Sequence, residues 1–425
     1  MTICSVRRVI LVAFVALLID VVSDSGDLGL DILYHVWALR LTRSMPMEQI
    51  NSCNYLHQRT ANRGSEVQDL AEWLGAVPEL VKAMRAHTTD VSVQCACGHA
   101  LEAVSTFNRK TSLAMADAGA IEAVVNALRN FPLDRNVQMM TAALSAFNDL
   151  APENRPRILD AGGVELVMTA MVNHYHDGGV LFRTGCAISA TSGDQGVADA
   201  IADFRGNGTE FLMQMMRDHL GSWRVGQEIM QATRNMMHID VKHRERLLRA
   251  GFVKAAVDTI RSEMHERGTP SIGSTNLAML AYHNRTMQDA IAAEGAIELI
   301  LHGMERWFNI DRSDYGGWTT SQVWPLLPSS LQALWTLSWE NPLVQGLIVE
   351  GEGLSIIGKT MGAHTQDMRI QRYGCATLAA LAKSNVSIRD AAVMFELPGW
   401  CKMHLKGNSV LELSEDILRG ELGRY

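Results

Sequence analysis

A repeat with a period of about 44 residues constrains the fold of this chain more than any other feature. Glycine recurs before an apolar run every 43 to 45 residues, with one degenerate copy at Gly206: Gly75, Gly119, Gly162, Gly206, Gly251 and Gly295. The next glycine of the series, Gly351, follows only after 56 residues, which indicates an insertion of about a dozen residues. Periods of roughly 40–47 residues are typical of arrays of helical units, not of independent domains.

A second signature runs in phase with the glycines. It consists of an apolar residue, a small residue, any two residues and an asparagine, and its asparagines are Asn108, Asn154, Asn284, Asn341 and Asn385. Asp240 replaces the asparagine in one further copy. Asparagine and aspartate are favoured helix N-caps because the side-chain oxygen accepts a hydrogen bond from an early helical N–H. We therefore expect each of these residues to begin a short helix.

Each unit is predicted to contain three helices. The first runs from the capping asparagine to the glycine, and the second follows the glycine with apolar residues at helical spacing, as at Ile121, Val124, Val125 and Leu128. The third begins near a Val-Gln or Ile-Gln pair: Val93-Gln94, Val137-Gln138 and Ile370-Gln371. No alternating β pattern competes with this interpretation, so the predicted fold class is all-α.

The segment Ala333–Ser338 and the recurring Ala-Gly-Gly/Ala-Ile/Val step resemble the armadillo repeat family. The resemblance implies a right-handed α-α superhelix of about seven full units and a degenerate final one. The implied organisation is a possible signal peptide, anchor or N-terminal helix at 1–25, an N-terminal cap or irregular segment at 26–65, the repeat array at 66–406 with an insertion at 309–322, and a C-terminal cap helix at 407–425.

Armadillo proteins include adaptors, nuclear transport receptors and signalling scaffolds. The resemblance therefore implies a non-catalytic scaffold that binds a protein or peptide through the concave surface, which the third helices line. The importin α branch would also imply a ladder of asparagines there, each paired with a tryptophan one turn earlier. The ladder positions here are Ala103, Asp149, Asn235, Met279, Thr336 and Ala380, although counting from Gln138 would select Ala146 in place of Asp149.

One ladder asparagine remains, and the positions four residues earlier contain no tryptophan: His99, Ser145, Gln231, Thr275, Gln332 and Ala376. Without amides along the groove, an extended peptide backbone loses its hydrogen-bond partners, which disfavours a nuclear transport receptor. The polar groove positions that we expect to contact a partner are Asn235, Gln231 and Asp149.

Tryptophans cluster around the predicted insertion. Five of the nine lie within 33 positions: Trp307, Trp318, Trp324, Trp335 and Trp339. Core packing is the ordinary explanation, and we expect it for at least half of them. Tryptophan is nevertheless enriched at binding hot spots, and long insertions in repeats usually lie on a functional face. Partner-binding residues are therefore predicted at Trp318, Trp324, Trp335 and Trp339.

Residue patterns typical of catalysis or cofactor binding do not occur. The chain contains no phosphate-binding glycine loop or hydrolase motif, and a net charge of −8 argues against a nucleic-acid partner. Cys95, Cys97 and His99 suggest a metal site, but only Cys95 and His99 share a helix face, and two ligands do not make a zinc site. We predict no catalytic, cofactor or metal residues.

Cysteine usage and the N-terminal residues bear on the compartment. Seven scattered cysteines do not suggest a disulfide framework, so we expect small hydrophobic fillers at helix interfaces. Arg7 and Arg8 precede an apolar run, Val9–Ile19, which fits a signal peptide or an anchor, but a packed N-terminal helix or a mis-assigned start codon fits equally well. The favoured location is cytoplasmic. The alternative is a structural protein of the secretory route, or one tethered to a membrane through residues 1–23 if that segment is retained.

The sequons at Asn207, Asn284 and Asn385 do not settle the compartment, because such triplets are frequent by chance.

Overall fold

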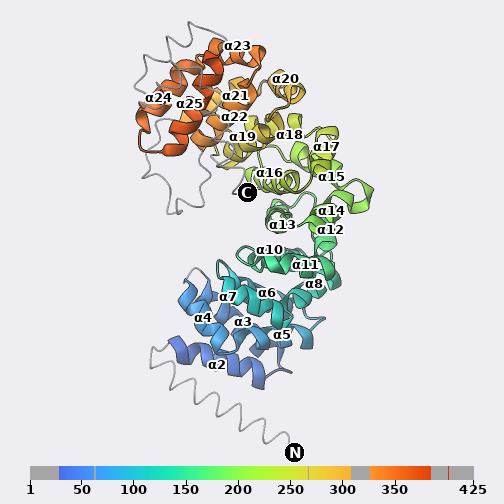
Figure 1. The fold of residues 1–425 in the computed structure, drawn as a ribbon. Helices are drawn as coiled ribbons and strands as arrows, with labels where there is room; N and C mark the ends of the chain where they lie inside the picture. Colours follow the sequence, from blue (N-terminus) through green and yellow to red (C-terminus); the bar gives the residue numbers. More distant parts are fainter. Residues whose placement is uncertain (1–27, 62–63, 267, 308–325, 384–400, 402–425) are drawn as a thin grey trace, which may run out of the picture. The chain divides into compact units, whose positions relative to one another are not determined.

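The computed structural model describes residues 28–61, 64–266, 268–307, 326–383 and 401. Every regular element within these ranges is a helix (Figure 1). The chain divides into two compact units: unit 1 contains residues 1–209 and 235–243, and unit 2 contains residues 210–234 and 244–425. The predicted all-α repeat architecture is confirmed.

Unit 1 repeats a short first helix, a second helix and a third helix. Its first helices are α4 (Ser65–Trp73), α7 (Arg109–Ala118), α11 (Arg155–Asp160) and α14 (Gln195–Asp203). Its second helices are α5 (Ala76–Ala86), α8 (Ala120–Asn130) and α12 (Gly163–Asn173). Its third helices are α6 (Val91–Ser105), the pair α9 (Arg135–Gln138) and α10 (Thr141–Ala146), and α13 (Gly178–Thr191). The 3-10 turn η1 (Pro152–Asn154) immediately precedes α11, and the 3-10 turn η2 (Phe204–Gly206) immediately follows α14. Two further helices, α2 (Leu28–Leu41) and α3 (Pro46–Thr60), come before α4.

Three helices contribute residues to both units: α15 (Gly208–Asp218), α16 (Trp223–Ile239) and α17 (Val241–Arg249). Unit 2 continues with the first helices α20 (Arg285–Ala293) and α23 (Pro342–Glu350) and the second helices α18 (Phe252–Ser262), α21 (Ala296–Trp307) and α24 (Gly353–Ala363). Its third helices are α19 (Gly268–Ala281), α22 (Leu326–Ser338) and α25 (Met368–Ala382). Third helices of consecutive repeats pack on one another: α19 packs on α22, and α22 packs on α25. Within unit 2, each of these repeats therefore contacts the next repeat in the sequence.

Left-handed glycines separate first helices from second helices. Gly75, Gly119, Gly162 and Gly251 have φ between 80° and 88° and immediately precede α5, α8, α12 and α18. Glycine adopts this conformation without the steric cost that a Cβ imposes. At the last such turn the role moves by one residue: Gly351 has φ −82°, and Glu352 takes the left-handed conformation with φ 57°.

Three of the predicted asparagine caps are confirmed. Oxygen atoms of Asn108, Asn284 and Asn341 accept hydrogen bonds from the backbone N–H groups three residues later, at 3.2, 3.2 and 3.1 Å. The residue before each cap is left-handed, with φ between 47° and 56°. Asp240 also caps α17, with Oδ1 2.9 Å from the Lys242 nitrogen.

The predicted cap at Asn154 is wrong. Its backbone is right-handed helical and its side chain makes no cap bond. The Nδ2 atom instead donates to the carbonyls of Phe147 and Ser112, at 2.6 and 3.1 Å. Phe147 lies seven residues before Asn154. Gln288 makes the equivalent hydrogen bond, to the carbonyl of Ala281, which also lies seven residues earlier. The apolar–small–Asn pattern at 150–154 was a coincidence in a different register.

A glutamine near the start of a third helix binds the carbonyls that end the second helix of the same unit. Gln94 Nε2 donates to Met84 and His87 oxygens, both at 2.8 Å. Gln138 and Gln371 make the same two contacts, ten and seven residues back. Gln49 donates to the Leu39 carbonyl at 3.2 Å, so α2 and α3 share this contact. The Val-Gln and Ile-Gln pairs therefore mark a helix-to-helix connection.

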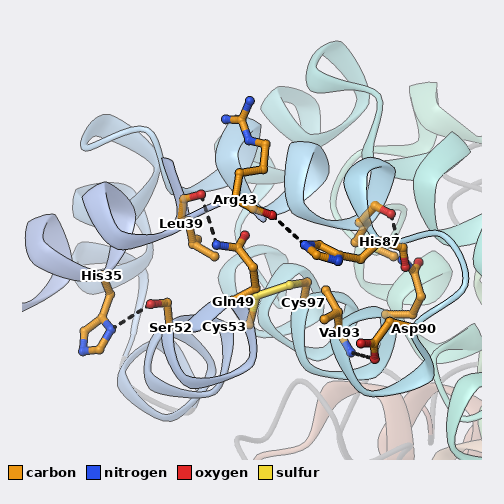
Figure 2. Close-up of a disulfide and its surroundings, with 12 residues drawn as sticks. His35, Leu39, Arg43, Gln49, Ser52, Cys53, His87, Asp90, Val93 and Cys97 are labelled. Atoms are coloured by element: carbon orange, nitrogen blue, oxygen red, sulfur yellow. Dashed lines mark hydrogen bonds between the residues drawn. A yellow bond between two sulfur atoms is a disulfide. The ribbon is translucent and has the colours of Figure 1, made fainter. Parts of the chain in front are cut away.

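The prediction that the cysteines are hydrophobic fillers is wrong for four of them. Disulfides join Cys53 of α3 to Cys97 of α6 (Figure 2) and Cys375 of α25 to Cys401. Cys53 and Cys97 are separated by 44 residues, one repeat period, and α3 packs on α6. We therefore count α3 as a third helix one repeat before α6; the Cα–Cα distance between the two cysteines is 4.8 Å. Cys95 and Cys186 are not part of either disulfide.

Several sequence predictions fall partly or wholly outside the described residues: the segment 1–25, the insertion 309–322 and the cap helix 407–425. The described part of 26–65 consists mainly of α2 and α3. None of the described helices has both the length and the apolar character needed to cross a membrane.

Adding a glycine at one left-handed turn and removing a glycine from another should change the stability of the protein in opposite directions. Glu352→Gly removes a left-handed Cβ and should raise the free energy of unfolding by about 1 kcal/mol, whereas Gly75→Ala, whose Cβ meets no atom within 4 Å, should lower it by about as much. Urea unfolding followed by circular dichroism measures both. Gly362→Ala, inside α24, is the control and should be neutral or stabilising; a loss there equal to that of Gly75→Ala would contradict the account.

Candidate functional site

The third helices of unit 1 leave one narrow stripe of side chains unburied. After its first residue, the unburied positions of α6 are Ser92, Cys95, His99 and Glu102, spaced three and four residues apart. This spacing places them on one helix face, and all other positions pack against neighbouring helices. On α13 the corresponding positions are Phe182, Arg183 and Cys186. We call Cys95, His99, Glu102, Phe182, Arg183 and Cys186 the third-helix face of unit 1.

An ion pair shows that α6 and α13 present these residues on the same side. Arg183 Nη1 lies 2.8 Å from Glu102 Oε1, although the two residues are 81 positions apart and α10 intervenes in the sequence. Their side chains are 34% and 18% exposed. This charge pair joins α6 to α13 across a complete repeat on this face.

Glu102 is held in the ionised state by its neighbours. Burial alone would raise the pKa of its carboxyl group, but the hydrogen bond from His99 and the charge of Arg183 outweigh burial and lower the pKa. His99 Nδ1 lies 3.4 Å from Glu102 Oε2. The face thus presents a fixed negative charge beside a guanidinium and an imidazole.

A cavity of about 360 Å³ opens beside this ion pair. Its lining includes Glu102 and Arg183, His57 from α3, Gln68 from α4, and Phe107. Phe107 is 61% exposed, which is unusual for a phenyl ring, and its φ of 56° places it in the turn before Asn108. The volume is at the lower end of ligand-binding pockets, and the groups are suited to contacts with charged and aromatic side chains.

The described residues supply no constellation for metal chemistry. No group of three or more His, Cys, Asp or Glu within them is arranged to hold a metal ion. Cys97 is bonded to Cys53, and His99 is bonded to Glu102, which uses two of the three residues that suggested a metal site.

The structure describes the side chains of two tryptophans of the predicted cluster, Trp335 and Trp339, and they differ in accessibility. Trp335 is 3% exposed, and its ring centroid lies 6.1 Å from that of Tyr373 on α25, which places it in the core of unit 2. Trp339 is half-buried at the turn after α22, with Lys383 Nζ 5.4 Å from its ring centre. Of the two, only Trp339 presents surface to a partner. Trp318 and Trp324 lie outside the described residues.

Of the three predicted polar groove residues, Asn235 and Gln231 lie on α16, and Asp149 follows α10. Asn235 on α16 is half-buried and donates from Nδ2 to the Ser189 carbonyl at 2.8 Å and to Ser192 Oγ at 3.2 Å. Its amide therefore connects α16 to α13. Gln231 is half-buried one turn earlier, and Asp149 is exposed after α10, where Ser145 Oγ lies 3.3 Å from its carboxylate.

Hydrogen bonds settle the ladder register that the sequence left open. Ser112 Oγ donates to the Ala146 carbonyl, as Gln68 Nε2 does to Ala103 and Gln345 Nε2 does to Ala380. Ala146 is therefore the residue equivalent to Ala103 and Ala380, and Asp149 lies three residues beyond the ladder position. Asn235 remains the one amide of the proposed ladder.

Sequence reasoning missed Glu102, Arg183 and Phe107. Glu102 and Arg183 lie in different repeats, and nothing in a single sequence links them. Phe107 occupies a turn position that His283 and Glu340 also occupy. All three residues are exposed, and Phe107 differs in carrying an apolar ring at that position. The one available signal was the unburied stripe on α6, which is visible from the helical spacing of its polar residues.

No family model matches this chain, and no curated protein matches it. Among solved structures, an engineered protein is similar over 88% of this chain and 87% of its own length, with a TM-score of 0.70 and 20% sequence identity. The fold is armadillo-like. A second engineered protein covers 62% of this chain with 99% of its own length, a TM-score of 0.50 and 15% identity. A designed armadillo repeat protein in complex with the peptide (KR)4 covers 61% of this chain with 99% of its own length, at a TM-score of 0.48 and 14% identity.

The two tryptophans should respond differently to truncation. Trp335→Ala should lower the free energy of unfolding by about 3–5 kcal/mol, because it empties a buried site, whereas the half-buried Trp339 should cost about 1 kcal/mol. Denaturant unfolding followed by circular dichroism compares them. Equal losses would show that Trp335 does not pack as described.

Proposed function

We propose that this protein is a non-catalytic scaffold that binds a segment of a protein partner through the third-helix face of unit 1. The repeat fold supplies long rows of parallel helices, and such folds bind partners along extended surfaces. The observation that carries the proposal is the Glu102–Arg183 pair beside the cavity with its exposed Phe107.

The proposal favours unit 1 because its third helices retain an unburied stripe. In unit 2, the described third helices are buried along almost their whole length: on α22, only Leu327 and Gln332 are not buried. A partner needs accessible groups, and Glu102, Arg183, His99 and Phe107 supply charge, hydrogen bonding and an apolar surface within one region. This combination of a charged pair and an aromatic anchor is typical of interaction hot spots.

Recognition of a basic peptide by an asparagine ladder is not part of the proposal. Ala103, Ala146 and Ala380 occupy ladder positions, and the amide of Asn235 is engaged with Ser189 and Ser192. A partner segment would therefore be held by side-chain contacts around the cavity, with few amides to hold its backbone.

Peptide selection tests this function and needs no candidate partner. A library of displayed peptides is selected on the full-length chain, and enriched peptides are measured by fluorescence anisotropy. The double variant Glu102→Gln, Arg183→Gln removes both charges while keeping side chains of similar length, and it should weaken binding about tenfold or more.

The matched control is the double variant Arg109→Gln, Glu153→Gln. That pair also joins neighbouring repeats, but it lies on a first helix and the turn before the next, and both side chains are about half exposed. Binding should change less than about twofold. Failure to enrich any peptide, or equal affinity in the Glu102–Arg183 variant and the wild type, would overturn the proposal. Thermal unfolding of both variants confirms that they are folded.

A further inference from the structure

The two disulfides occupy equivalent positions at the outermost described third helices. Cys53 lies eight residues after Met45, the N-cap of α3, and Cys375 lies eight residues after Asp367, the N-cap of α25. Cys53 bonds to Cys97 on α6 and Cys375 bonds to Cys401, and all four side chains are 0% exposed.

Formation of these bonds requires an oxidising compartment. Each pair of thiols gives up two electrons and two protons to an acceptor disulfide, such as that of a thiol–disulfide oxidoreductase, which is released as two thiols. Disulfides persist in secretory and extracellular environments and are rare where glutathione keeps thiols reduced. Four buried cysteines in two bonds, one at each end of the described array, therefore point to the secretory route.

An independent feature points the same way: Asn284 differs from the other capping asparagines. Asn108 and Asn341 are 5% and 0% exposed, and their Nδ2 atoms donate to Asp69 and Asp289 at 2.9 and 2.8 Å. Asn284 is exposed, and within the described part of the chain its Nδ2 has no acceptor. Arg285 and Thr286 follow it and complete an N-glycosylation triplet, with Thr286 also exposed.

Asn207 is a second accessible acceptor. It lies in the turn between η2 and α15, directly after Gly206 with φ 81°, and its side chain is exposed. Gly208 and Thr209 complete the triplet. A bulky glycan requires a surface position in the folded protein, and this turn meets the requirement. The third triplet, at Asn385, lies outside the described residues.

We propose that Asn207 and Asn284 carry N-linked glycans and that the chain matures in an oxidising, glycosylating compartment. The apolar run after Arg7 and Arg8 has the composition of a signal for that route. Neither asparagine is among the residues of the third-helix face of unit 1. The inference does not depend on the proposed function.

The test expresses the full chain, residues 1–425, in cells with a secretory pathway. Wild-type protein is treated with an N-glycosidase in heavy-oxygen water, which marks each released site as aspartate, and tryptic peptides are read by mass spectrometry. Label is expected at 207 and 284. Thr286→Ala should abolish modification of Asn284 while leaving its capping oxygen in place, and Thr286→Ser should retain it. Asn126, exposed but outside any triplet, is the internal control and should stay unlabelled.

Peptide mapping without reduction, after alkylation of free thiols, tests the disulfides in the same sample. Linked peptides are expected for Cys53–Cys97 and Cys375–Cys401, and alkylation for Cys95 and Cys186. Alkylation of all six, or protein retained in the cytosol without label, would overturn the proposal. Disulfides without label at 207 or 284 would overturn the glycan assignment at that asparagine.

Discussion

The stack of repeats depends on side-chain amides that bind the carbonyl groups at helix ends. The last four carbonyls of a helix lack partners within it, and a buried carbonyl without a partner costs about 1–3 kcal/mol. Gln288 donates to Ala281 at the end of α19 and to Thr336 near the end of α22, and Gln345 makes the same bridge between α22 and α25. One amide thus satisfies two consecutive third helices and sets the step between them.

Arginine side chains also bind carbonyl groups of the neighbouring repeat, at a different place in the repeat. An arginine near the end of a second helix donates to a carbonyl at the glycine turn of the following repeat. Among the described residues, three do this: Arg85, Arg129 and Arg261. All of these contacts join neighbouring repeats, so the position of each repeat is set by the repeat next to it.

Much of this fold could be predicted because each periodic residue answers a local requirement. Glycine at the left-handed turn, asparagine at the cap and glutamine after Val or Ile each leave a mark at a fixed position in the sequence. Asn154 misled because the same amide can cap a helix or bind a carbonyl, and the pattern does not distinguish the two. Cys53 and Cys97 carried a usable signal, a separation equal to the repeat period, whereas the Glu102–Arg183 contact depends on geometry accumulated across α10 and leaves none.

Hydrogen exchange in the variant Gln345→Ala tests most directly whether neighbouring amide bridges hold the array together. Loss of the bridge should speed exchange of amides in the last turns of α22 and α25 by about 5- to 150-fold, corresponding to about 1–3 kcal/mol, and leave α6 and α8 unchanged. Gln332→Ala, a half-buried glutamine of α22 without this bridge, serves as the control. Unchanged exchange at α22 and α25, or equal acceleration in both units, would contradict the account.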